Sequence, residues 1–282
     1  KTRTDLKQLD ITQPEGASFT TEGYRVKWQG YDLRVSIHPV HGLVLHQMSL
    51  KGRPVLYRAA LSEMIVPYGD ADNMHSWKHV LDASEYNMGT LVNSLKLGCD
   101  CLGEIHYFDI HQVTWDGKAK TVENAICMHE EDYGIQWKHY DLLTKVSEVR
   151  RSRRLVISSI FTVGNYDYGF YWYLYLDGTI QMEIKLTGIV GVSAVTPETH
   201  NAAQAPMIAD SLASPVHQHL FCFRLDWELD GGNNSLYENE IEVVPLGENN
   251  PDGTQFCSVS RHLADEPSAK RNIAPQVSRH WK

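Results

Sequence analysis

Residues 170–176 have the sequence Phe-Tyr-Trp-Tyr-Leu-Tyr-Leu, followed by Asp-Gly-Thr at 177–179 and Ile-Gln-Met-Glu-Ile-Lys-Leu at 180–186. The first seven residues are apolar or aromatic at every position, which is typical of a strand buried between two layers. The last seven alternate between apolar and polar residues, as a strand with one buried face does. The Asp-Gly pair between them favours a tight turn. This stretch therefore predicts a β-hairpin with one strand in the interior of the protein.

Short alternating segments of the same kind recur along the chain. Residues 24–28 (Tyr-Arg-Val-Lys-Trp) and 33–37 (Leu-Arg-Val-Ser-Ile) alternate, and residues 220–226 form a further strand candidate. Helical periodicity is scarce, and the best helix candidate, at 75–80, is short. The pattern predicts an all-β fold, a large antiparallel β-sandwich. From residue 247 onward the sequence is polar and irregular, which indicates a long loop or an excursion away from the sheet.

The composition argues against several classes of protein. The chain has 282 residues, of which 42% are hydrophobic and 22% are charged, and its formal net charge is −9. The hydrophobic fraction is too high for a disordered chain, and no apolar run is long enough to span a bilayer. The net negative charge argues against a general nucleic-acid binder, whose affinity comes largely from Lys and Arg. The basic run at 150–154 precedes an apolar stretch, so we interpret it as a solvated strand entrance.

Fourteen histidines point to metal or proton chemistry. His217 and His219 flank a single residue, and on a strand such a pair projects from one face with a spacing that suits copper, zinc or nickel. Two ordinary surface histidines are the simpler alternative. The five cysteines are too few and too scattered for a disulfide scaffold. Cys99 and Cys101 are too close together for a zinc knuckle, whereas a cysteine there could close a stabilising loop with Cys127.

Two further segments combine aromatic and acidic residues in ways that suit catalysis. Residues 162–169 place Tyr166 between an amide and a carboxylate, beside glycine and directly before the aromatic strand. Residues 68–70 (Tyr-Gly-Asp) are followed by Asp82, and an aspartate in an apolar setting near a tyrosine can act as a general base of raised pKa. Taken alone, each segment has a plainer interpretation, turn chemistry in the first case and a turn or cap aspartate in the second.

Together these segments resemble one family, the copper-containing amine oxidases, and especially its microbial and fungal members. The resemblance covers nearly the whole chain and implies the β-sandwich catalytic domain of that family, with its carboxy-terminal part missing. We expect residues 1–20 to be a linker remnant from a preceding domain and residues 21–282 to be a partial catalytic domain. The motifs that carry the resemblance, in the family's order, are 68–70 (Tyr-Gly-Asp), 97–103 (Leu-Gly-Cys-Asp-Cys-Leu-Gly), 127–132 (Cys-Met-His-Glu-Glu-Asp), 165–168 (Asn-Tyr-Asp-Tyr) and 217–219 (His-Gln-His).

The resemblance implies oxidative deamination of primary amines by O₂ to aldehyde, ammonia and hydrogen peroxide. Tyr166 matches the tyrosine that family members convert, with copper(II) and O₂, to the quinone cofactor topaquinone. Asn165 matches the residue that packs against the quinone, and Tyr68 matches the phenol that hydrogen-bonds it. Asp82 corresponds to the catalytic base that removes a proton from the α-carbon of the amine. Val80 corresponds to a position in the wall of the substrate channel.

The resemblance also implies two metal sites. His217 and His219 match two of the family's three copper ligands, and we expect the third histidine beyond the end of this chain. Asp226 and the carbonyl of Trp227 match part of a peripheral calcium-type site, for which oxygen ligands are suited. Because two imidazoles make an incomplete copper site, we expect the isolated chain to bind copper weakly and to form little quinone.

Other implications concern covalent links, partners and setting. Cys101 and Cys127 match the family's intradomain disulfide. Family members are homodimers, so we expect a homodimer of the full-length protein, with no nucleic-acid or membrane partner. No signal peptide or transmembrane segment is recognisable, which favours a cytoplasmic or peroxisomal location. The alternatives are a non-catalytic β-sandwich of the same ancestry that binds metal or a partner, and a zinc hydrolase, which would want a glutamate near the histidine pair. The joint presence of residues 165–167, Asp82 and the histidine pair favours the oxidase.

Overall fold

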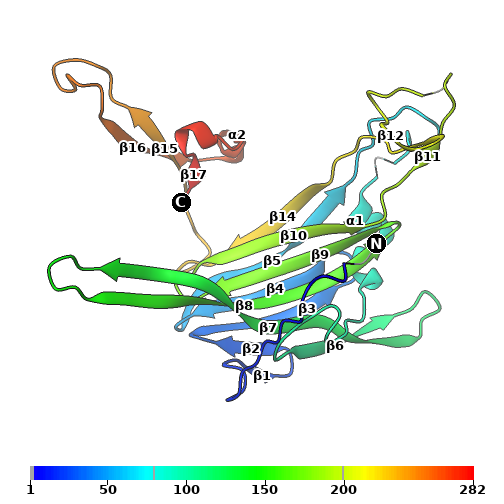
Figure 1. Cartoon of the computed structure of the whole chain (residues 1–282), viewed down its shortest axis with the longest axis horizontal. Helices are drawn as coiled ribbons and strands as arrows, with labels where there is room; N and C mark the ends of the chain where they lie inside the picture. The colour runs from blue at the N-terminus through cyan, green and yellow to red at the C-terminus, as the bar shows by residue number, and fades with distance from the viewer. Residues whose placement is uncertain (1–2, 79, 199) are drawn as a thin grey trace. The chain divides into compact units, whose positions relative to one another are not determined.

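The computed structural model describes residues 3–78, 80–198 and 200–282. The chain divides into two compact units, Lys1–Trp227 and Glu228–Lys282. The first unit consists mainly of antiparallel strands (Figure 1). Its elements are β1 (Thr20–Glu22), β2 (Arg25–Trp28), β3 (Tyr31–His38), β4 (Gly42–Leu50), β5 (Arg53–Ile65), α1 (Asp82–Tyr86), η1 (Met88–Leu91), β6 (His106–Val113), β7 (Ala119–Tyr140), β8 (Ser147–Val163), β9 (Tyr166–Tyr175), β10 (Ile180–Gly188), β11 (Ser193–Ala194), β12 (Met207–Ala209), β13 (Leu212–Ala213) and β14 (Leu220–Trp227).

Two large sheets form the body of the first unit. One has the strand order β1-β2-β3-β4-β5-β14 and the other β10-β9-β8-β7-β6, and a small third sheet has the order β11-β13-β12. Apolar side chains of both large sheets share one core, in which Trp28 and Leu45 from the first sheet pack with Met128 and Trp172 from the second. The predicted antiparallel β-sandwich is therefore confirmed, with its hydrophobic core between the two sheets.

The hairpin predicted from residues 170–186 is present as β9 and β10. Strand β9 lies inside its sheet, between β8 and β10. Trp172 and Leu174 are buried in the main core, whereas Tyr173 and Tyr175 are buried in a separate cluster with Val156. Both faces of β9 are thus covered, which explains the absence of polar alternation along it.

A buried carboxylate fastens the amino-terminal segment to the sandwich. Glu130 on β7 accepts hydrogen bonds from the Trp28 indole (2.8 Å), the Ser18 N–H (2.7 Å) and the Gln13 amide (2.7 Å). Arg153 lies 3.6 Å away. Burial raises the pKa of Glu130, but these hydrogen bonds outweigh burial and hold the pKa below its ordinary value. Glu130 is therefore ionised and fully partnered in the folded chain.

The structure differs from the sequence-based prediction at two places in the first unit. Residues 73–77 form turns, residue 79 lies outside the described part, and the helix α1 begins only at Asp82. The Asp72 carboxylate accepts the Met74 N–H, which stabilises the turn at the expected start of the helix. The basic run 150–154 lies inside β8 and pairs with β7, where acidic side chains face it, so it is not a strand entrance.

The second unit rules out one of the two alternatives expected after residue 247, a single long loop, because these residues belong to a separate unit with strands of its own. It contains β15 (Leu236–Val243), β16 (Phe256–Leu263), α2 (Glu266–Ala269), η2 (Pro275–Val277) and β17 (His280–Trp281), with the strand order β16-β15-β17. Glu238 on β15 is 3% exposed and pairs with Arg271 (3.0 Å) and Arg279 (3.3 Å). Because a buried carboxylate with two arginine partners stands on β15 where an apolar residue would be expected, hydrophobic periodicity is a weak signal for these strands.

Two further expectations concern the ends of the chain and membranes. Of the linker predicted at 1–20, residues 1–2 lie outside the described part, and residues 3–13 form no helix or strand. Among the described residues, no helix has both the length and the apolar character needed to cross a bilayer.

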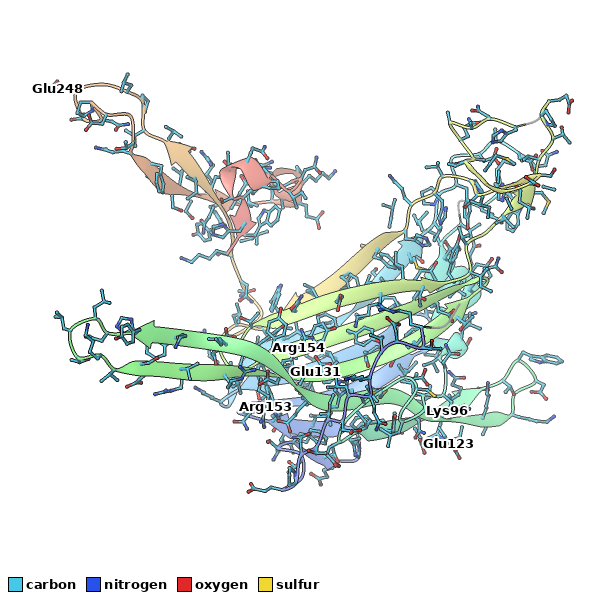
Figure 2. All side chains as sticks on the ribbon, in the orientation of Figure 1. Lys96, Glu123, Glu131, Arg153, Arg154 and Glu248 are labelled. Carbon is cyan, nitrogen blue, oxygen red and sulfur yellow. The ribbon has the colours of Figure 1, made fainter. Side chains whose placement is uncertain are left out.

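We predict that Glu130→Ala lowers the free energy of unfolding of the chain by about 3 kcal/mol, because three donors lose a buried charged acceptor. Glu130→Gln, which keeps one acceptor, should cost less. Urea denaturation followed by tryptophan fluorescence measures both. Glu123, an exposed residue on the same strand (Figure 2), provides the control, and Glu123→Ala should change stability by less than about 0.5 kcal/mol. Equal losses for the two alanine variants would contradict the assignment.

Candidate active site

The site begins where two distant segments pair through their backbones. Tyr68 and His217 form an antiparallel bridge outside the named strands, and the Gly69 N–H donates to the Val216 carbonyl at 2.7 Å. A Cβ on Gly69 would lie 3.1 Å from that carbonyl oxygen, so glycine permits the close approach. The Tyr68 ring consequently stacks between His217 (centroids 4.8 Å apart) and the buried His75 (5.5 Å).

The phenol of Tyr166 meets this pair and makes every hydrogen bond available to it. His217 Nδ1 lies 2.9 Å from the Pro215 carbonyl, to which it donates, so in the neutral ring Nε2 carries the lone pair. The Tyr166 hydroxyl lies 3.1 Å from that Nε2 and donates to it. The same oxygen accepts the Gly191 N–H at 3.0 Å and the Tyr68 hydroxyl at 3.4 Å. The ring is thus held by one side chain of the histidine pair, one phenol and one main-chain donor.

The second histidine of the pair converges on the same phenol. The His219 ring lies 5.0 Å from the His217 ring and 5.2 Å from the Tyr166 ring. The two histidines do not lie on a strand as predicted, because β14 begins only at Leu220. The backbone before β14 nevertheless places the two rings 5.0 Å apart, and their role as metal ligands stays a prediction.

The two imidazoles of His217 and His219 are ligands of a kind that suits copper. His217 uses its Nδ1 on a carbonyl and His219 has its Nδ1 3.1 Å from the Tyr168 hydroxyl, so the Nε2 of each ring is the nitrogen that would bind a metal. In this structure the Nε2 of His217 is hydrogen-bonded to the Tyr166 hydroxyl. Burial, with a smaller contribution from His217, lowers the pKa of His219 and so favours the neutral ring that binds metal. Residues 3–78, 80–198 and 200–282 contain no cluster of three His, Cys, Asp or Glu side chains suited to a metal ion.

Asp82 is the first residue of α1, and its surroundings make it a weaker acid than usual. Burial raises the pKa of Asp82 to about 6, although the Val66 N–H donates to its carboxylate at 3.0 Å. The charges of Glu63 and Glu85 add to the effect of burial. Glu63 also accepts the Ala83 N–H at 2.8 Å, which holds the first turn of this short helix in place.

One cavity of about 170 Å³ brings the four predicted catalytic residues together. Asp82, Tyr166, Asn165 and Tyr68 all line it, and so does Val80, the expected channel position. The structure also places at the cavity residues to which the sequence patterns assign no role. They are Trp77 and Tyr86, whose side chains are largely exposed at the cavity, Lys78, whose ammonium lies 5.1 Å from the centre of the Tyr68 ring, and Gly191 and Tyr168.

The residues of the expected calcium-type site lie elsewhere, at the end of β14. Asp226 pairs with Arg58 across the β5–β14 ladder, and Trp227 pairs with Leu56 after a bulge. The guanidinium of Arg224 lies 4.0 Å from the Asp226 carboxylate. A peripheral metal at Asp226 and Trp227 stays a prediction.

The cysteines of the expected disulfide lie next to one another. Cys101 and Cys127 are buried in one small apolar cluster, and their side chains are hydrogen-bonded. The structure gives both as free thiols, as it does Cys99, Cys222 and Cys257. A disulfide between Cys101 and Cys127 therefore stays a prediction.

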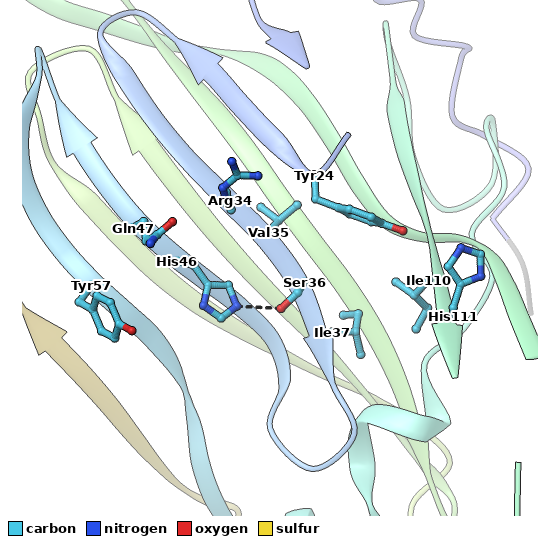
Figure 3. Close-up of a pocket in the computed structure, with 10 residues that line it drawn as sticks. All are labelled: Tyr24, Arg34, Val35, Ser36, Ile37, His46, Gln47, Tyr57, Ile110 and His111. Carbon is cyan, nitrogen blue, oxygen red and sulfur yellow. Dashed lines mark hydrogen bonds between the residues drawn. The ribbon is translucent and has the colours of Figure 1, made fainter. Parts of the chain in front are cut away.

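A roomier hollow of about 570 Å³ lies against β3 and β4 (Figure 3). Its polar contact is a hydrogen bond of 2.8 Å between Ser36 and His46. Tyr24, Tyr57 and Arg34 also line it, but none of the motif residues does. Size alone therefore does not mark the site, and the smaller cavity at Asp82 and Tyr166 holds the acid–base and redox-capable groups.

Comparisons with known proteins give one consistent family. The model of the copper amine oxidase enzyme domain matches residues 20–282. The chain is 51% identical to a primary amine oxidase of Arthrobacter sp. (strain P1), over 99% of the chain and 43% of that protein. It is 42% identical to the peroxisomal N-methylputrescine oxidase 1 of Nicotiana tabacum, over 99% of the chain and 36% of that protein.

The structure matches as well. The crystal structure of a copper-containing benzylamine oxidase from Hansenula polymorpha superimposes with a TM-score of 0.91 at 31% identity, covering 100% of this chain and 44% of that one. The chain spans about two fifths of the length of the relatives it matches.

We predict that Asp82→Asn stabilises the chain at pH 7.5 but not near pH 4. The folded-state pKa is raised to about 6 from the ordinary 3.8, so stability is lost as the pH rises between these values. The gain from removing the desolvated charge should be on the order of 2 kcal/mol, allowing for partial exposure of the carboxylate. Thermal unfolding at both pH values measures it, with Asp252→Asn, an exposed site, as control. An equal effect at both pH values would refute the burial of charge as the cause.

Proposed function

Because the chain belongs to the copper amine oxidase family, we propose that the full-length protein oxidatively deaminates primary amines to aldehyde, ammonia and hydrogen peroxide. Members of the family use copper and a topaquinone derived from a tyrosine. One observation supports the proposal above the others. The Tyr166 ring and the Asp82 carboxylate line one cavity, while the Tyr166 hydroxyl points at His217.

His217 and His219 are the residues that would hold copper, and Tyr166 is the residue that would become the quinone. When bound and formed, these groups take up the two electrons of the amine and pass them to O₂. Tyr68 acts as a hydrogen-bond donor to the oxygen at position 166. Burial, followed by its contact with Tyr166, raises the pKa of Tyr68, so its hydroxyl stays protonated at neutral pH. Asn165, at the cavity wall, limits the space in which the ring can turn.

Asp82 serves as the base for the α-carbon proton of the amine. With a pKa of about 6 it is mostly ionised at neutral pH, yet it is a stronger base than an exposed aspartate. Apolar and aromatic walls shield the carboxylate in part from water, and Trp77 and Tyr86, which also line the cavity, suit the hydrocarbon part of an amine. A small residue at Val80 leaves room for a bulky or aromatic substrate.

The remaining expectations become proposals of the same kind. We propose that a third copper ligand comes from another part of the longer protein, because the described residues supply only the two histidines and the relatives are more than twice as long. We also propose the calcium-type site at Asp226 and Trp227, and a cytoplasmic or peroxisomal location, for which the name of the tobacco relative gives support.

A homodimer is the proposed assembly, and one hairpin offers the surface for it. Strands β7 and β8 continue beyond the sheet as a projecting arm (Figure 1). Apolar side chains on the arm are exposed, among them Ile135 (57%), Trp137 (48%) and Leu143 (92%). Large apolar side chains on a projecting hairpin are costly to solvate, and a second copy of the protein is the partner that would cover them.

In the full-length enzyme, we predict that Asp82→Asn still forms the quinone but lowers kcat by about 10³-fold, because no base accepts the α-proton. Tyr166→Phe should form no quinone at all. Phenylhydrazine labelling, read in the visible spectrum, measures the quinone, and peroxide release measures turnover. Glu85→Gln is the matched control, since it removes a nearby exposed charge and should only move the acidic limb of the pH profile to lower pH. If Asp82→Asn retains turnover within about tenfold of wild type, Asp82 is not the base that accepts the α-carbon proton.

We predict that Trp137→Asp combined with Leu143→Asp converts the full-length dimer to monomers at micromolar concentration, because each dimer would bury several charges in an apolar contact. Sedimentation velocity measures the change. Trp115→Asp, at a fully exposed turn between β6 and β7, is the control and should leave the sedimentation coefficient unchanged. A double variant that stays dimeric places the interface elsewhere.

A further inference from the structure

The cavity at Tyr166 contains a lysine that the proposed reaction does not use. Lys78 lines this cavity together with Asp82. Apart from the phenols of the tyrosines, these two are the ionisable side chains among the described lining residues. Asp82 is the proposed base, whereas Lys78 brings an ammonium group to a site whose proposed substrate is itself a cation in water. A protein cation in a cavity that receives cations affects which of them can bind.

A turn with a buried histidine fixes Lys78 at the cavity. The Lys78 N–H donates to the His75 carbonyl at 2.9 Å. The His75 side chain is 2% exposed, lies 3.2 Å from the Asp70 carboxylate and stacks on the Tyr68 ring. The ammonium of Lys78 lies 5.1 Å from the centre of the Tyr68 ring and 5.8 Å from the centre of the Trp77 ring. Both distances suit a cation–π contact, so the ammonium lies against two aromatic rings of the cavity wall.

The position of this ammonium limits what a second cation can contact. Proteins hold an alkylammonium group with a carboxylate or with the face of an aromatic ring. The rings of Tyr68 and Trp77 already contact Lys78, so they are less open to a cation of the ligand. The Glu63 carboxylate does not line the cavity and accepts three backbone N–H groups. Asp82 can balance one cation, and the described lining residues supply no carboxylate for a second.

We propose that Lys78 is a specificity-determining residue, which selects primary monoamines with an uncharged remainder over diamines that carry a second ammonium group. The inference rests on the proposed amine oxidation and names its substrate class. The reacting ammonium is attracted by Asp82, whereas the distal ammonium of a diamine meets Lys78. Two like charges about 6 Å apart in a cavity that is partly open to water repel enough to change the affinity by about tenfold. Added salt screens this repulsion.

The test compares two amines with the same carbon chain, hexylamine and hexamethylenediamine, on the full-length protein. Peroxide release gives kcat/KM for each amine, and the ratio of the two values is the readout. We expect wild type to favour hexylamine by about tenfold, and less so at high salt. Lys78→Gln should reduce this preference by about threefold or more, because it removes the repulsion. Lys78→Glu should reverse the preference, because it supplies a carboxylate, and Lys78→Arg should keep it.

A binding measurement separates charge selection from catalysis. Tyr166→Phe protein cannot form the quinone, so titration calorimetry on it reports amine binding alone. When Lys78→Glu is added to this variant, the affinity for the diamine should rise at least about fivefold more than the affinity for hexylamine. Lys96→Glu provides the matched control, since it makes the same change of charge at an exposed residue that does not line the cavity (Figure 2). It should leave both ratios unchanged.

The outcomes distinguish this inference from the function on which it rests. The role of Lys78 is overturned if wild type prefers the diamine, if Lys78→Glu leaves the ratio within about twofold of wild type, or if Lys96→Glu changes the ratio as much as Lys78→Glu does. Should wild type oxidise neither amine, the proposed oxidation fails, and the calorimetric comparison alone then decides whether Lys78 selects against a second charge.

Discussion

The site depends on one backbone pairing, the bridge between Tyr68 and His217. The ladder between β5 and β14 ends at Ile65 and Leu220, and the bridge continues the same antiparallel course past the ends of both strands. It stacks the tyrosine on the histidine and delivers both to the Tyr166 hydroxyl, which would lose two of its three partners if the segments separated. Sheet formation and site assembly are therefore one event, because the same ladder extends through both.

Much of the fold could be predicted because the apolar residues of many strands recur with the two-residue repeat of a β-strand, so the sequence marks which face is buried. Residues 170–186 carry their own turn signal and a strand covered on both faces, and both features are present in β9 and β10. Prediction failed where polar or charged side chains stabilise the backbone conformation. The Asp72 turn replaced the expected helix at 75–80, and the ion pairs of Glu238 with two arginines hold strands that have no hydrophobic pattern.

The candidate site was predictable in its side chains but not in its geometry. The resemblance named Asp82 and Tyr166, yet no spacing in the sequence says that they line one cavity, since the sandwich must form before they meet. The raised pKa of Asp82 depends on burial by β5 and on the charge of Glu63, neither of which is local to the motif. Pro215 and Gly191 act through a carbonyl and an amide, and groups that every residue possesses leave no signature in a sequence.

The hydrogen bond from the Gly191 amide to Tyr166 has a consequence for how such sites are mapped. Alanine scanning replaces side chains only, and a methyl group at position 191 would meet the two phenol oxygens at 3.4 and 3.6 Å, ordinary contact distances. An alanine variant would keep the donor and score as tolerant, so a mutational map would rank position 191 as unimportant. An ester linkage introduced by unnatural-residue incorporation deletes the amide hydrogen without adding a side chain, and it would reveal what the main chain contributes there.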